Sequence, residues 1–286
     1  MRRISLLLFV SFCISPVLHA QDKPNEIACY SYQGKNDAYK KKLWDGYEIS
    51  LGPSRDADAV EEKCTAAIYS SAGHVVFRTN GFNVVFDEKL TGQDFDGDGK
   101  PEVVFRTDTG GGNHCCWGYV IYSLSPKPHK LFEIAMEGRV DFEKDKDGKM
   151  VIWDRVSVPG AVGTSMAARP FAAKVMRVKD AKLVDATPEF CGTKDERLER
   201  GYLRPEDLKK LEGTGDQSSV DNEEIVSTLE SRTAQHVFCH EYDEALKDIN
   251  LWPPDKLDDV AQNLMEAFKN EYPEFVAKLR ETLKKK

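Results

Sequence analysis

The residues of this chain that could do chemistry are concentrated in one acidic loop, where oxygen donors recur at alternate positions: Asp94, Asp96, Asp98, Lys100 and Glu102. The four carboxylates and the Lys100 backbone carbonyl would converge inside a tight turn, whose backbone angles Gly97 and Gly99 tolerate. Calcium takes about six to eight oxygen ligands in flexible geometry. Because four carboxylates packed without a cation would repel one another, the spacing predicts a Ca²⁺ site. The alternative is a solvated Asp-Gly turn.

An EF-hand interpretation of this loop, and metal binding by a second acidic segment, are both less favourable. An EF-hand would need a bidentate glutamate at the position that Phe105 occupies, and the residues after Glu102 are strand-like. A second acidic segment, Glu143–Gly148, also precedes a strand-like run. It has Val151 in place of Glu102, and its lysines lower its negative charge, so we expect no tight metal binding there.

A glycine-rich loop, Gly110–Trp117, carries the next candidate chemistry, because His114 lies beside Cys115 and Cys116. A catalytic cysteine must stay reduced and have a base within reach. An envelope hydrolase built on this loop is therefore the alternative function, although no ordered set of nucleophile, base and orienting residue is visible. His236 and His240 have a spacing that can hold zinc on a helix, but a structural helix with two histidines is the preferred interpretation.

The N-terminus indicates export. Arg2 and Arg3 precede an apolar run that is shorter than the roughly 20 residues of a membrane span, and residues 1–20 are expected to be a cleaved signal peptide. No other segment is apolar for long enough to cross a membrane. We therefore predict a periplasmic or secreted protein.

Cysteine usage and charge fit export. Of seven cysteines, Cys13 is lost with the signal, and the remaining even number suits disulfides. We expect Cys29 to pair with Cys64, and the vicinal Cys115-Cys116 to join Cys191 and Cys239. The net charge of −8 becomes −10 when two arginines are removed with the signal, which argues against nucleic acid and anionic membranes as partners.

The elements that must position the acidic loop are short strands. Runs rich in Val, Ile, Phe and Tyr, bounded by Gly, Asn and Asp, predict strands at 27–33, 74–79, 83–87, 102–107, 117–124, 130–135, 149–156 and 171–178. Asn80-Gly81 predicts a tight hairpin turn. No helical segment alternates with these strands, so an antiparallel sheet is favoured over a βαβ fold.

After Pro188 the pattern becomes helical. Helices are predicted at Arg204–Leu211, from a cap at Asp221 toward Leu246, from a cap at Asp255 through Phe268, and around Phe275–Leu279. A polar linker at 213–219 separates the first two. The resulting division is 1–20 signal peptide, 21–188 β-rich domain and 189–286 helical region.

The acidic loop between two strands resembles the calcium loops of FG-GAP and VCBS-type β-propeller repeats, with Glu102 where aspartate is usual. Residues 109–117 resemble the Ser-Gly-Gly-Ala-His-Cys-Cys segment that follows the loop in a group of exported bacterial proteins, and 182–188 resemble that group's strand ending. The likeness covers residues 74–190. It implies a partial-propeller-like antiparallel β domain and a metal loop, but no activity.

Together these features predict an α+β chain that is exported, calcium-binding and disulfide-stabilised. Its predicted function is to bind a protein or glycan partner in the cell envelope.

Overall fold

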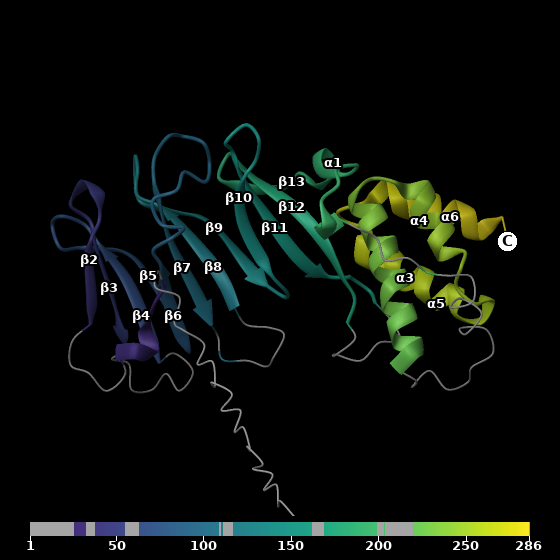
Figure 1. Cartoon of the computed structure of the whole chain (residues 1–286), viewed down its shortest axis with the longest axis horizontal. Helices are drawn as coiled ribbons and strands as arrows, with labels where there is room; N and C mark the ends of the chain where they lie inside the picture. Colours follow the sequence, from purple (N-terminus) through teal and green to yellow (C-terminus); the bar gives the residue numbers. More distant parts are fainter. Residues whose placement is uncertain are drawn as a thin grey trace, which may run out of the picture.

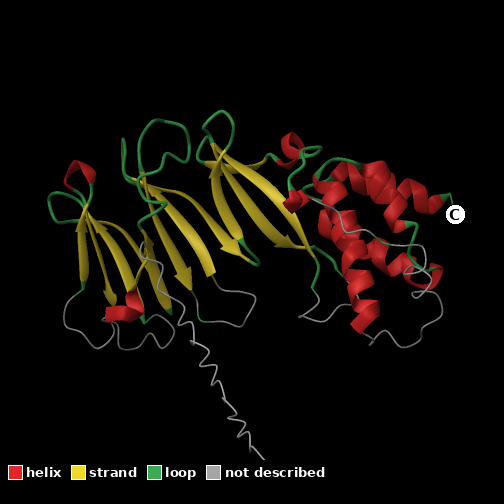
Figure 2. Ribbon diagram, viewed as in Figure 1, coloured by secondary structure: helices red, strands yellow, loops and turns green. Residues whose placement is uncertain are grey.

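The computed structural model describes residues 26–32, 38–54, 63–108, 110, 117–161, 169–198, 203 and 220–285. Over these residues, thirteen strands form three antiparallel sheets, and the C-terminal part is helical (Figures 1 and 2). The sheets follow one another along the long axis, and the helices lie beyond the third sheet. The predicted α+β class is confirmed at this level.

Each sheet is built mainly from consecutive strands. The first sheet consists of β2 (Tyr39–Lys42), β3 (Glu48–Pro53), β4 (Cys64–Tyr69) and β5 (Val75–Gly81). The middle sheet consists of β1 (Glu26–Ala28), β6 (Asn83–Asp87), β7 (Glu102–Asp108), β8 (Trp117–Ser123) and β9 (His129–Met136). The third sheet consists of β10 (Val140–Lys144), β11 (Met150–Ser157), β12 (Phe171–Lys179) and β13 (Lys182–Asp185). Apart from β1, each sheet is therefore a simple meander.

The middle sheet is buried on both faces. Because successive side chains of a strand point to opposite faces, Val103 and Phe105 enter the core shared with the first sheet, whereas Val104 enters the core shared with the third sheet. This double burial explains why the start of β7 is a continuous apolar run rather than an alternating one.

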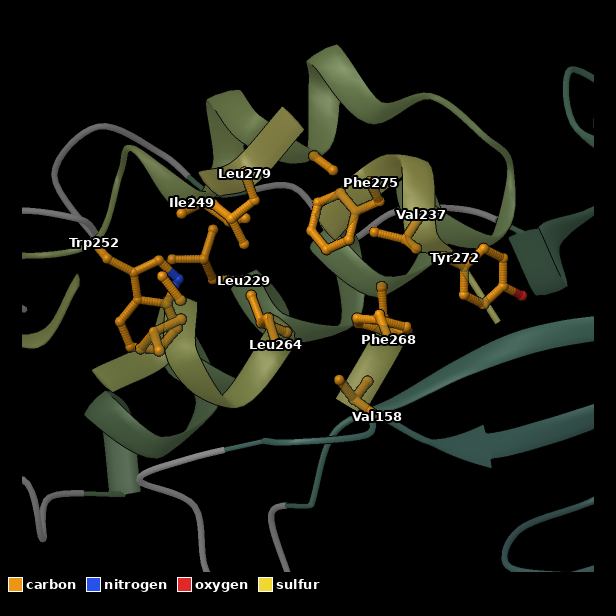
Figure 3. Close-up of a cluster of buried hydrophobic side chains, with 14 of the residues drawn as sticks. Val158, Leu229, Val237, Ile249, Trp252, Leu264, Phe268, Tyr272, Phe275 and Leu279 are labelled. Carbon is orange, nitrogen blue, oxygen red and sulfur yellow. The ribbon is translucent and has the colours of Figure 1, made fainter. Parts of the chain in front are cut away.

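The helical region has its own core, drawn in Figure 3. It is formed by α3 (Val220–Phe238), α4 (Tyr242–Ile249), α5 (Pro254–Phe268) and α6 (Pro273–Lys284). Val158, which follows β11, packs into the same core. The Gln235 side chain on α3 donates to the Ala173 carbonyl at 3.1 Å and accepts from the Ala173 amide at 2.9 Å. These two bonds attach α3 to the backbone of β12 in the third sheet.

Most predicted strands are present, but five were missed and one turn was wrong. The missed strands β2, β3, β4, β10 and β13 are short and carry lysines, small residues or Gly-Pro instead of β-branched runs. Asn80 and Gly81 do not form a hairpin turn, because they end β5 of the first sheet while β6 belongs to the middle sheet. The predicted strand at 27–33 is also shorter, since a 3-10 helix η1 (Cys29–Tyr32) begins after Ala28.

Two helix predictions also need correction. The helix expected to run from Asp221 toward Leu246 ends at Phe238, because His240 adopts a positive φ of 59° and α4 begins at Tyr242. Asp255 is not a cap: Pro254 is the first residue of α5, and Pro253 occupies the cap position. The predicted helix at Arg204–Leu211, the linker at 213–219 and the signal at 1–20 lie outside the described residues.

One disulfide prediction is confirmed and the other is wrong. Cys29 bonds to Cys64, as expected. Cys191 bonds to Cys239, so neither joins the vicinal cysteines, which lie outside the described residues. The second bond links the segment after the third sheet to the end of α3. Among the described helices, none is long and apolar enough to cross a membrane.

Candidate metal centre in the acidic loop

The acidic loop, Asp94–Glu102, ends the connection between β6 and β7 of the middle sheet. The amide of Glu102 donates to the Gln93 carbonyl at 2.9 Å, and the Gly92 amide donates to the Glu102 carbonyl at 2.8 Å, so the base of the loop is closed by backbone bonds. Phe95 anchors the loop. Its ring is buried in the core between the middle and third sheets, 5.6 Å from the Phe142 ring between centroids.

Within the loop, aspartate side chains bind backbone amides. The two Asp94 carboxylate oxygens accept from Gly97 at 2.7 Å and from Gly99 at 2.9 Å. Asp96 accepts from the Asp98 amide at 3.1 Å, and Asp98 accepts from the Lys100 amide at 2.8 Å. Gly97 and Gly99 both have φ of 82°, a left-handed conformation that other residues rarely adopt. These bonds orient the aspartates by local turn geometry.

Glu102 completes the arrangement from the first position of β7. Its side chain is fully buried, and its Oε2 accepts from the Phe95 amide at 2.8 Å. Its Oε1 is buried without a hydrogen-bond partner among the described residues. A buried carboxylate oxygen without a partner carries a substantial desolvation cost. A cation would remove that cost.

Oxygens of Asp94, Asp96 and Glu102 lie within 4.8 Å of one another. Calcium–oxygen distances are about 2.3–2.6 Å, so two ligands of one ion can be about 5 Å apart at most, and the three oxygens fit one ion. Asp98 is not in this group, and its side chain is exposed. The loop thus brings together three of the four predicted carboxylates. Metal binding by Asp98 and by the Lys100 carbonyl stays a prediction, because neither is in this group of oxygens.

The electrostatics of the loop favour a positive charge. Burial first, and then the negative charges of Asp96, Asp94 and Asp98, raise the pKa of the Glu102 carboxyl from 4.5 to about 7, against the lowering effect of the Phe95 amide. Burial, together with Asp98 and Asp94, also raises the pKa of Asp96. In both groups the ionised form is destabilised by loss of water and by like charges. A bound cation would reverse this balance.

In the second acidic segment, Glu143–Gly148, an arginine side chain pairs with the central carboxylate. It connects β10 and β11, as the acidic loop connects β6 and β7, so both follow the first strand of a meander. There Asp145 accepts from the amides of Asp147 and Lys149, and its Oδ2 lies 2.7 Å from a guanidinium nitrogen of Arg177 on β12. An arginine therefore supplies the positive charge. Sequence reasoning missed Arg177, because it comes from a strand far along the chain.

The other sequence candidates are not assembled into a site by the described residues. Of Gly110–Trp117, the structure describes Gly110 and Trp117, so the hydrolase alternative on this loop stays untested. His236 and His240 do not converge: His236 is buried with Nδ1 2.8 Å from a Glu241 oxygen, whereas His240 is exposed.

The sequence matches no family model, and no curated protein matches it. Among solved structures, the chain is similar to PliI-Ah, a periplasmic inhibitor of I-type lysozyme from Aeromonas hydrophyla. The match has 16% identity and a TM-score of 0.25, and covers 34% of this chain and 88% of the inhibitor. A likeness of this extent indicates neither a shared fold nor a shared activity.

Proposed function

We propose that this protein is an exported, calcium-binding and disulfide-stabilised β module that binds a protein or glycan partner in the cell envelope. The observation that carries the metal assignment is Glu102, whose fully buried Oε1 has no hydrogen-bond partner among the described residues and which groups with Asp94 and Asp96. The Lys100 carbonyl and Asp98 are proposed to complete the shell.

Two further features support the proposal. The bonds Cys29–Cys64 and Cys191–Cys239 suit an oxidising compartment outside the cytoplasm. The succession of meanders with acidic loops at equivalent connections suits the proposed relation to FG-GAP and VCBS-type repeats, as a partial propeller. Calcium would act here as a structural ion, because it would join the start of β7 to the loop that Phe95 anchors between two sheets.

Thermal unfolding with calcium and with a chelator tests the metal assignment. Exported calcium sites have Kd values of about 0.1–1 mM, so several millimolar calcium should stabilise the fold by about 1–2 kcal/mol. For a protein of this size the corresponding rise in Tm is a few degrees. The double variant Asp96→Asn with Asp98→Asn should lose this rise, and in chelator it should be no less stable than the wild type, because it removes like charges.

The matched control is Asp147→Asn with Asp180→Asn, which removes the same number of acidic charges from two exposed turn positions but leaves the acidic loop intact. It should keep the full calcium response. Equal melting temperatures of the wild type in calcium and in chelator would show that the loop is only a turn.

A further inference from the structure

A second feature of the molecule is a cavity of about 790 Å³ between the third sheet and the helical region. Its floor is the outer face of β10, β11 and β12, and its walls are α3 and a 3-10 helix, η4 (Glu196–Leu198). Trp153 on β11 lies on the floor, in register with Asp141 on β10. The volume lies within the range of sites that bind small organic molecules.

The walls of this cavity are held by specific contacts. On the η4 side, Arg197 bonds both carboxylate oxygens of Glu143 at 2.9 and 3.1 Å, and its guanidinium lies 3.7 Å from the Trp153 ring centroid. On the opposite side, α3 is fixed by the two Gln235–Ala173 hydrogen bonds and by the disulfide at its end. Anchored walls reduce the ordering cost that a ligand would meet.

The charges in the cavity are unequally satisfied. Arg197 pairs with Glu143 and Asp195, and Arg232 pairs with Asp248 of α4. Arg155 is exposed, lies 5.0 Å from the Phe171 ring centroid, and has no ion pair within the described part of the chain. It is the cavity's unneutralised arginine.

Arg155 also lies directly beside a second arginine. Its amide donates to the carbonyl of Arg139, the residue before β10, at 2.9 Å, so Arg139 lies opposite Arg155 at the end of the β10–β11 pairing. Like charges opposite each other on neighbouring strands destabilise a sheet. Asp141 offsets only Arg139, at 2.9 Å. The cavity lining also contains Lys194, which like Arg155 has no salt bridge among the described residues, so these two side chains are the cations that an anionic group of a ligand could pair with.

Hydrogen-bond acceptors line the same cavity as the arginine pair. The carboxylates of Asp141 and Glu143 line the cavity with the hydroxyl of Ser231, and they can hydrogen-bond ligand hydroxyl groups. Guanidinium groups bind carboxylates in a planar, bidentate manner. The lining thus combines carboxylate recognition with hydroxyl recognition.

We propose that this cavity binds an acidic saccharide, whose carboxylate pairs with Arg155 beside Arg139 and whose hydroxyls bond the acidic residues around them. This inference rests on the proposed glycan-binding function and names its ligand class. The cavity contains no residue of Asp94–Glu102, so its occupation does not depend on the calcium assignment.

The test is isothermal titration of the full-length protein at physiological salt with a glucuronate-containing hyaluronan tetrasaccharide. Maltotetraose is the neutral probe and glutarate the simple carboxylate. The wild type should bind the acidic tetrasaccharide and neither of the others measurably. Arg155→Gln should weaken binding about tenfold or more, because a charge-assisted hydrogen bond is lost. Lys179→Gln, which removes an exposed positive charge outside the cavity, should bind as the wild type does.

Arg155→Gln should melt no lower than the wild type, because it removes one of two opposed like charges, and this separates loss of binding from loss of folding. Absence of binding by the acidic tetrasaccharide, equal binding of maltotetraose or glutarate, or unchanged binding in Arg155→Gln would each overturn the proposal. The calcium response of the same samples is a separate readout, so failure here does not count against the metal loop.

Discussion

At the residue scale, the two acidic segments of the molecule balance their negative charge in different ways. Two acidic segments begin with similar patterns, yet one pairs Asp145 with Arg177 and the other buries Glu102 beside two aspartates. The difference is visible in sequence at one position, since Val151 in the second segment stands where Glu102 stands in the first. The cation Arg177 could not be found from sequence, because the pairing of β12 with β11 brings it there.

Asp154 gives a pH prediction that is independent of the metal. Burial, and to a lesser extent Glu137, raises the pKa of its carboxyl from 3.8 to about 6, and its Oδ1 has no hydrogen-bond partner in the described part of the structure. The raised pKa means that the protonated form favours folding. This contribution is fully present below about pH 3.8 and is lost as the pH rises through about 6.

Asp154→Asn should therefore stabilise the protein at pH 7.5 by about 1–3 kcal/mol, since a shift of one pKa unit corresponds to about 1.4 kcal/mol. Near pH 4 most of that advantage should disappear. Chemical unfolding of both proteins at the two pH values measures the difference. An equal stability difference at both would show that ionisation of Asp154 is not the cause.

At the element scale, the acidic loop is tied to the packing of two sheets through Phe95. Its amide donates to Glu102, while its ring packs between the middle and third sheets against Phe132 and Phe142. Phe95→Ala should cost about 3–5 kcal/mol in stability, as buried Phe-to-Ala changes generally do. It should also weaken calcium binding, because the loop loses its anchor.

Phe95→Leu is the matched control, because it keeps an apolar anchor and should retain most of the calcium response. Urea unfolding with calcium and with chelator gives both quantities. If Phe95→Ala lost stability but kept the full calcium increment, the loop would not depend on its anchor.

Sequence periodicity identified elements where burial leaves a clear pattern. The runs in β7, β8 and β11 are apolar because both faces of these strands meet a core, and their predicted positions agree with the structure. In the first sheet β5 was predicted but the strands before it were not: β2 contains three lysines, and β4 uses Thr65, Ala66 and Ala67 where larger residues are usual. The break after Phe238 lacks a Gly or Pro signal, since His240 supplies the positive φ.

At the scale of the whole molecule, the three sheets form an open stack whose two ends differ. The outer face of the first sheet carries one cross-strand row of Lys40, Ser50, Ala67 and Arg78, in which Ala67 is buried and the exposed Lys40 and Arg78 at its two ends suit contact with water. The other end is covered by helices, which pack on β12 (Figure 1). A polar outer face at one end and packed helices at the other leave neither end of the stack as an exposed apolar surface.

The Cys191–Cys239 bond is expected to hold the helical region against the third sheet. Its 48-residue separation corresponds to about 4 kcal/mol of loop entropy in the unfolded chain. Cys191→Ala with Cys239→Ala should thus lower stability by about 2–4 kcal/mol in denaturant unfolding. Peptide mapping without reduction should recover the two cysteines as one linked pair. Recovery of either cysteine linked to Cys115 or Cys116 would contradict the assignment.

The candidate site was more predictable than the molecule around it. The spacing of alternate acids is local, so the grouping of Asp94, Asp96 and Glu102 could be predicted from sequence alone. The cavity beside the third sheet could not, because its residues come from β10, β11, β12, η4 and α3, and only the packing of sheet against helices brings them together.

The measurement that tests the central proposal most directly is calorimetric titration of the mature, chelator-treated protein with calcium. The wild type should bind one ion at the acidic loop, with a Kd of about 0.1–1 mM. Glu102→Gln keeps an acceptor for the Phe95 amide but removes the buried charge, and it should abolish this binding at millimolar calcium. Absence of binding by the wild type, or unchanged binding by Glu102→Gln, would contradict the assignment of calcium to this loop.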